Sequence, residues 1–209
     1  RNLLVVSCEA IQPMAKWNFK DQFHDIDHDD VGFVNGVIEA LVAARVTDPQ
    51  TIYATGHSSG GLFCYRLAKQ TDLFAALAPM SCGMAKGDHT PEEGTQPVSI
   101  FQVIGDQDKS FHGSSNPKVT MYSADKRINI WRMFNQCDAQ PTINRPFEKL
   151  TLRTYVNAHD IEVVLCTVAG EGHHIRHDLR DKADRIALDF LMNHRRNADH
   201  KQDKYNPNE

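Results

Sequence analysis

One five-residue motif, Gly56-His57-Ser58-Ser59-Gly60, constrains the fold of this chain more than any other feature, because it matches the pattern G-x-S-x-G. An apolar stretch over 51–54 precedes it and favours a short strand, whereas the pattern over 62–67 favours a helix. A serine between a strand and a helix lies on a sharp turn, which flanking glycines permit. The motif predicts that the Ser58 hydroxyl lies at a helix N-terminus, where free N–H groups favour negative charge.

Strand and helix patterns alternate along the 209 residues. Strands are predicted at 3–6, 51–54, 74–80, 98–104, 149–156 and 162–168, the first of them buried on both faces of the sheet and the last two paired as a hairpin. Helices are predicted at about 30–45, 62–67, 123–135 and 178–194, and polar loops at 8–29, 83–97 and 105–123. The pattern predicts an α/β fold with a mostly parallel sheet, in one domain over 1–195 with a polar tail over 196–209.

Three of the predicted strands end near residues with catalytic chemistry: first Ser58, then Asp108, then His173. In parallel α/β sheets the functional groups gather at the carboxyl ends of the strands. A serine hydroxyl needs a neighbouring base, and the base needs an acceptor that fixes its tautomer. The chain order Ser, Asp, His is that of the α/β-hydrolase triad. We therefore predict Ser58 as nucleophile, Asp108 as acid and His173 as base.

Alternatives remain open for each of these positions. Ser58 could be a turn serine in a glycine-rich loop. Asp106 lies in the same loop as Asp108, and His174 and His177 follow His173 closely. The glycine before His173, in a loop directly after a strand, favours His173 as the base.

Two groups of histidines and carboxylates have spacings that could bind a metal, so a metallohydrolase is an alternative function. The first group is His24, Asp25, His28, Asp29 and Asp30, and the second is the pair His173 and His177. The other interpretation of the first group is an acidic loop in which Asp29 or Asp30 caps the following helix.

Charge and composition exclude some classes of partner. The net charge of −4 gives no reason to expect a nucleic acid or an anionic membrane as partner, and no apolar run approaches the ~20 residues of a membrane span. The five cysteines are an odd number without a C-x-x-C pair, so we expect no disulfide scaffold. The first residues do not have the pattern of a signal peptide, and the apolar run at 3–6 predicts that they lie inside a fold.

Seven segments of the chain occur together in a known enzyme family: 17–18 (WN), 30–34 (DVGFV), 53–62 (YATGHSSGGL), 65–68 (YRLA), 74–79 (FAALAP), 105–108 (GDQD) and 170–173 (GEGH). Together they resemble the poly(3-hydroxybutyrate) depolymerase and feruloyl esterase family of α/β-hydrolases, which is related to acetylxylan esterases. The resemblance implies an α/β-hydrolase fold with helices on both faces of the sheet, and a serine carboxylesterase that needs no cofactor.

The resemblance also assigns residues and substrates. It implies Ser58, Asp108 and His173 as the triad and the backbone N–H of Ser59 as an oxyanion donor. Candidate substrates are hydroxyalkanoate oligomers and feruloyl or acetyl esters of polysaccharide, with a secreted or periplasmic location. Substrate contacts are predicted at Trp17, His57 and Phe111.

The chain departs from the family pattern in two respects. The family's first strands and a His-Gly loop that supplies a second oxyanion donor are not found, so we expect a fragment or an incomplete member. Where many members carry cysteines, this chain has Lys16 and, near the hairpin turn, Ala158, which leaves Cys137 without its expected partner. These departures leave a third hypothesis open: a non-catalytic member of the family that binds a ligand or partner.

Overall fold

The computed structural model describes residues 3–10, 17–20, 28–116 and 119–196. Six strands form one mixed sheet in the order β1-β2-β3-β8-β7-β6. Their bounds are β1 Tyr53–His57, β2 Ala76–Met80, β3 Ser99–Gly105, β6 Thr142–Phe147, β7 Leu150–Val156 and β8 Glu162–Val168. Strands β1, β2, β3 and β8 run parallel, and β7 and β6 join antiparallel. The predicted α/β fold with a mostly parallel sheet is confirmed, as is the hairpin of the last two predicted strands.

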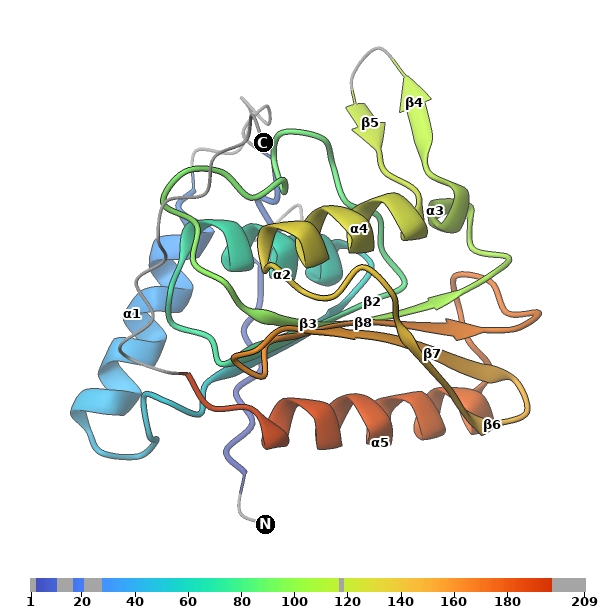
Figure 1. The fold of residues 1–209 in the computed structure, drawn as a ribbon. Coiled ribbons are helices and arrows are strands. Elements are labelled where there is room, and N and C mark those ends of the chain that lie inside the picture. Colours follow the sequence, from blue (N-terminus) through green and yellow to red (C-terminus); the bar gives the residue numbers. More distant parts are fainter. Residues whose placement is uncertain (1–2, 11–16, 21–27, 117–118, 197–209) are drawn as a thin grey trace.

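Helices cover both faces of this sheet, as predicted (Figure 1). Helices α2 (Ser59–Gln70) and α4 (Ala124–Phe134) lie on one face, and α5 (His177–Asn193) lies on the other. Helix α1 (Asp30–Ala43) lies beside α2. Asp29 caps α1 by accepting a hydrogen bond from the Gly32 N–H, as the sequence predicted for Asp29 or Asp30.

The apolar stripes of the helices build a core on each face of the sheet. Ile128, Trp131 and Phe134 of α4 are buried on the α2 side. On the other side, Phe190 of α5 packs against Phe101 of β3, with ring centroids 5.1 Å apart. Burying one such side chain contributes roughly 1.5–3 kcal/mol. The two cores fix β3 in the middle of the molecule, and every residue of β3 is buried.

The prediction of a buried strand at 3–6 is wrong. These residues have no strand geometry, and the side chain of Val5 is 83% exposed. An apolar run becomes a strand only where a neighbouring strand accepts its hydrogen bonds. Among the described residues, none pairs with this segment.

The predicted loop at 105–123 contains regular structure that the sequence did not reveal. It holds the short helix α3 (Lys109–His112) and the hairpin of β4 (Ser114–Asn116) and β5 (Val119–Met121), which projects from the sheet in Figure 1. Strand β6 was also missed, because all of its residues are exposed and it lacks an apolar pattern.

The five cysteines are free, and Cys64, Cys82, Cys137 and Cys166 are buried. Burial raises the pKa of the Cys166 thiol to about 12, which suits a packed apolar group rather than a reactive one. Among the described residues, no helix has the length and apolarity that crossing a membrane requires.

The boundary between the domain and the predicted tail at 196–209 stays a prediction. Arg196 is described, and its backbone N–H donates to the Gln50 carbonyl. The remainder of that tail, 197–209, lies outside the described residues.

Candidate active site

Ser58 occupies a strained turn between β1 and α2. Its φ of 55° and ψ of −114° are unusual for a residue with a side chain. The turn is held from both sides, because the Ser58 N–H donates to the Met80 carbonyl at 3.0 Å and the Ser58 carbonyl accepts from the Leu62 N–H at 3.0 Å. These bonds, one to β2 and one into α2, fix the serine at the carboxyl end of β1.

The two glycines of the G-x-S-x-G motif have different roles. A Cβ on Gly56 would lie 2.4 Å from the carbonyl carbon of Gly60, so the strand and the helix can approach only if residue 56 is glycine. A Cβ on Gly60 would meet no atom within 4 Å. The close approach that shapes the turn therefore depends on Gly56.

This difference gives a first prediction. Gly56→Ala is expected to destabilise the fold by about 1–3 kcal/mol, because the clash is with backbone that must shift. Gly60→Ala, a matched change inside a helix, is expected to be neutral or to stabilise by up to about 1 kcal/mol. Urea unfolding of both variants measures the effect. Equal losses in the two variants would contradict this description of the turn.

The structure brings Ser58, His173 and Asp108 together. The Ser58 Oγ lies 3.0 Å from His173 Nε2, and His173 Nδ1 lies 2.9 Å from Asp108 Oδ2. With its proton on Nδ1, the imidazole donates to Asp108 and accepts the Ser58 hydroxyl proton on Nε2. The Asp108 side chain is 2% exposed and that of His173 is 39% exposed. The hydrogen-bonded series therefore begins at the buried Asp108 carboxylate, passes through the partly exposed His173 imidazole and ends at the Ser58 hydroxyl.

Asp108 follows β3 and caps α3. Its Oδ1 accepts from the Ser110 N–H at 2.8 Å, which leaves Oδ2 for His173. Burial raises the pKa of Asp108, but the hydrogen bonds from Ser110 and His173 lower it more, so its pKa lies below the ordinary value. The carboxylate therefore stays ionised at neutral pH.

The loops that carry Asp108 and His173 are bonded to each other. The Gln107 N–H donates to the Glu171 carbonyl at 2.9 Å. Asp106 Oδ1 accepts from the Gly170 N–H at 2.8 Å. A Cβ on Gly105 would lie 2.0 Å from the Glu171 carbonyl oxygen, so the two loops are in direct contact. Asp106 thus faces Gly170, and Asp108 is the carboxylate that reaches the histidine.

A carboxylate that the sequence reasoning missed holds the turn after β8. Glu171 accepts from the Arg176 backbone N–H at 2.9 Å and from its Nε at 2.8 Å. The N–H of Arg176 is the main reason that the pKa of Glu171 lies below its ordinary value. These bonds close the segment 171–176 around His173. The sequence gives no local signal for the bonds between Glu171 and Arg176, except that an acidic residue lies shortly before the start of α5.

Among the described hydrogen bonds, none joins Ser58 to His174 or His177, the other two candidate histidines. The His177 side chain is 92% exposed, and its Nδ1 lies 3.2 Å from Asp181. The His174 ring packs on that of His57, with centroids 5.8 Å apart. His173 is therefore the histidine that the fold brings to the serine.

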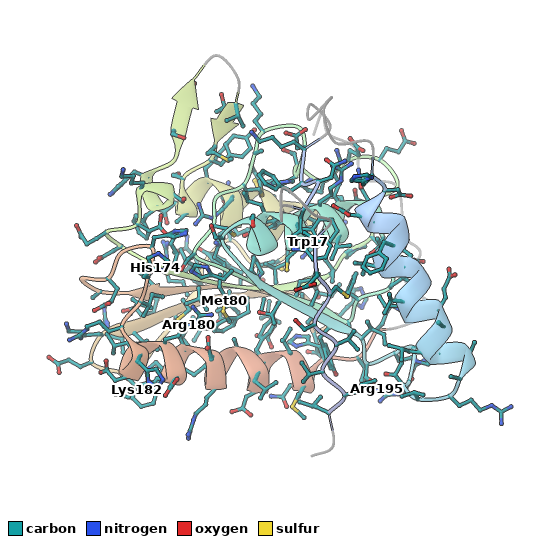
Figure 2. The ribbon with its side chains drawn as sticks, turned by 180° about the vertical axis from the view of Figure 1, so that it is seen from behind. Trp17, Met80, His174, Arg180, Lys182 and Arg195 are labelled. Atoms are coloured by element: carbon teal, nitrogen blue, oxygen red, sulfur yellow. The ribbon has the colours of Figure 1, made fainter. Side chains whose placement is uncertain are left out.

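His57 supports the histidine loop from the α5 side. Its Nε2 lies 3.2 Å from the His173 carbonyl oxygen. Burial lowers the pKa of His57, the bond to that carbonyl raises it, and the nearby His173, Arg180 and His174 lower it, so that the net shift is downward. Figure 2 shows His174 and Arg180 in this region, close to the first half of α5. The prediction that His57 contacts substrate stays a prediction.

The other predicted substrate contacts, Trp17 and Phe111, pack against the core. Trp17 stacks on Phe63 of α2, with ring centroids 4.8 Å apart and an interplanar angle of 5°, and Figure 2 shows it over that helix. Phe111 lies in α3, and its N–H donates to the Asp108 carbonyl at 2.8 Å. Both side chains are half-buried against the core, and their contact with substrate remains a prediction.

Four residues of the two suggested metal groups have other partners: Asp29, Asp30, His173 and His177. His24 and Asp25 lie outside the described residues. Asp29 caps α1, and Asp30 Oδ2 accepts from the Asn18 N–H at 2.6 Å. Among the described residues, no group of three or more His, Cys, Asp or Glu side chains could hold a metal ion.

No protein-family model matches the chain. A curated protein from Nocardia uniformis subsp. tsuyamanensis, named "Putative esterase NocK", is 34% identical to it over 89 residues. The match covers 41% of this chain and 26% of that protein, so it spans about a quarter of the relative's length.

Three solved structures show weaker similarity. The acetyl xylan esterase from Aspergillus awamori is 14% identical, with a TM-score of 0.49, over 72% of this chain and 65% of that chain. SOBER1 from Arabidopsis thaliana is 15% identical, with a TM-score of 0.45, over 77% and 63%. Esterase PE8 is 13% identical, with a TM-score of 0.45, over 79% and 67%. The strand order of the sheet and the helices on its two faces define the α/β fold of this chain.

Proposed function

We propose that the protein is a serine carboxylesterase of the α/β-hydrolase type, with Ser58, His173 and Asp108 as its triad. The observation that carries the proposal is the unbroken series of hydrogen bonds from Ser58 Oγ through the two His173 nitrogens to Asp108 Oδ2. The three residues lie at the carboxyl ends of β1, β8 and β3, which is where α/β enzymes act. The similarity of an 89-residue stretch to a protein named as an esterase supports esters as the substrate class.

The proposed reaction proceeds in two steps. Ser58 Oγ attacks the ester carbonyl carbon while His173 Nε2 takes the hydroxyl proton. The bond to the alcohol breaks, and His173 returns that proton to the departing alkoxide. Water, deprotonated by the same nitrogen, then attacks the acyl group and releases the acid with Ser58 restored. Asp108 stabilises the imidazolium that forms in each step, because its buried carboxylate is ionised and bonded to Nδ1.

Negative charge on the carbonyl oxygen is expected to meet the start of α2. Ser59 is the first residue of that helix, so its N–H has no carbonyl partner within the helix. It adjoins the nucleophile directly, which makes it the first candidate for an oxyanion donor. The substrates implied by the sequence resemblance are hydroxyalkanoate oligomers and feruloyl or acetyl polysaccharide esters.

The proposal is tested by hydrolysis of p-nitrophenyl acetate, p-nitrophenyl butyrate and methyl ferulate. We expect turnover of the short p-nitrophenyl esters, its loss after treatment with a fluorophosphonate, and no effect of a chelator. Relative rates on the three esters then separate acetyl, hydroxyalkanoate-like and feruloyl preference. Activity that a chelator removes and a fluorophosphonate spares would favour a metallohydrolase. A folded protein with neither hydrolysis nor labelling would favour a binding protein.

A further inference from the structure

Arg127 of α4 is a buried cation with no acidic partner among the described residues. Its side chain is 0% exposed. No carboxylate of the described residues lies within 4 Å of its guanidinium. Burying a charge without a counter-ion costs several kcal/mol, so a buried arginine of this kind needs an explanation beyond packing.

The guanidinium of Arg127 donates hydrogen bonds to three segments of the chain. Its Nε donates to Gln102 Oε1 of β3 at 2.5 Å. Its Nη1 donates to the Ser110 carbonyl at 2.9 Å and to the Tyr122 carbonyl at 3.1 Å. Residues 110 and 122 lie near the two ends of the excursion that contains α3 and the β4–β5 hairpin. The Arg127 side chain therefore connects β3, the strand before Asp108, with both ends of the segment that contains α3 and the β4–β5 hairpin.

Ser110 links this group to the triad. Its carbonyl accepts from Arg127, while its N–H donates to Asp108 Oδ1 at 2.8 Å. The other carboxylate oxygen, Oδ2, faces His173. If the backbone of Ser110 moved, Asp108 would lose the bond that orients its carboxylate.

We propose that Arg127 is a positioning residue for the Asp108–His173 pair, acting through the backbone of Ser110; this inference rests on the proposed function. Arg127 does not contact the reacting atoms. Its planar guanidinium holds carbonyls and an amide oxygen in fixed directions, which a flexible ammonium cannot reproduce. The orientation of the Asp108 carboxylate therefore depends on Arg127, which belongs to a different element, α4.

Tyr65 offers a matched control in the same buried network. It is 1% exposed, and its hydroxyl donates to the same Gln102 oxygen that Arg127 contacts. None of its described hydrogen bonds reaches Ser110. Tyr65→Phe thus removes a buried hydrogen bond of this network but neither the bond from Arg127 to Ser110 nor the bond from Ser110 to Asp108, and costs about 1 kcal/mol or somewhat more of stability.

The test compares Arg127→Met with Tyr65→Phe in the full chain. Arg127→Met is expected to lower kcat for p-nitrophenyl acetate about 10- to 100-fold with KM changed less than about threefold, because a small misplacement affects the reacting geometry. Tyr65→Phe is expected to keep kcat within about twofold of wild type. Should Arg127→Met fail to fold, Arg127→Lys replaces it, since one ammonium cannot span Gln102 and Ser110, and a smaller fall in kcat is expected.

A spectroscopic measurement reads the same geometry without turnover. The proton on His173 Nδ1, assigned by its absence in His173→Gln, is expected at low field in wild type and Tyr65→Phe. In the Arg127 variants its resonance is expected to move upfield or broaden. Equal falls in kcat for the Arg127 and Tyr65 variants, or an unchanged resonance in the Arg127 variants, would overturn the proposal. A wild type that shows the resonance but no esterase activity would instead refute the proposed function and leave the positioning role measurable.

Discussion

Ser58→Ala is expected to lower kcat for p-nitrophenyl acetate by about 10⁴-fold or more, because removal of the nucleophile leaves only binding and oxyanion stabilisation. The fold should survive, since the Ser58 side chain makes no cap hydrogen bond to α2 and alanine adds no atom to the turn. The thermal unfolding midpoint is therefore expected to stay close to that of wild type. Kinetics and a thermal melt on the same sample measure both effects.

Ser123→Ala is the matched control for the loss of a serine hydroxyl. Ser123 caps α4, where its Oγ accepts from the Lys126 N–H at 3.3 Å, away from the triad. Its removal should cost about 1 kcal/mol of stability and leave turnover close to wild type. Ser58→Ala is thus expected to lose turnover and keep its stability, whereas Ser123→Ala is expected to lose some stability and keep its turnover. Wild-type turnover in Ser58→Ala would exclude Ser58 as the nucleophile.

Asp108→Asn is expected to lower kcat about 10³- to 10⁴-fold at neutral pH. An amide cannot stabilise the imidazolium as a carboxylate does, and its NH₂ group can donate to Nδ1, which favours the wrong tautomer of His173. KM should change little, because Asp108 is buried and does not face substrate. Steady-state kinetics of the variant measure the effect.

Asp106→Asn is the control for this second prediction. It lies two residues away in the same loop, but its Oδ1 accepts from the Gly170 N–H rather than from the histidine. An asparagine oxygen can accept the same bond, so the expected loss of kcat is less than about tenfold. A larger loss in Asp106→Asn than in Asp108→Asn would show that the acid has been assigned to the wrong residue.

That Ser58, Asp108 and His173 lie close together could be predicted from the sequence, because it follows from the motif around Ser58 and from the direction of the strands. A G-x-S-x-G turn after an apolar strand fixes the place of Ser58, and parallel strands bring their carboxyl ends to one edge. The same rules left Asp106 and His174 as alternatives. That choice depends on how the loops after β3 and β8 pack together, and contacts such as the one between Gln107 and Glu171 carry no sequence signal.

The buried position of Arg127, which we propose as a support for Asp108, could not be predicted from the sequence. Arg127 follows Lys126 in an amphipathic helix, and such a pair is typical of a solvent-facing surface. Only the tertiary fold shows that one of the two side chains points inward to Gln102 and Ser110. The segment 3–6 shows the converse error, since its apolar residues satisfy the strand pattern and yet are exposed. Burial of a residue depends on its neighbours, which a local pattern does not contain.

The proposed function requires Ser58 to form a covalent acyl intermediate, and mass spectrometry after fluorophosphonate treatment tests this most directly. We expect one adduct per chain, located on the peptide that contains Ser58, formed at the same rate at which hydrolysis of p-nitrophenyl acetate is lost. Ser58→Ala and the unfolded protein should carry no adduct, because the reactivity depends on His173. An adduct on another serine, or full hydrolysis by protein whose Ser58 is unmodified after treatment, would contradict the proposed role of Ser58.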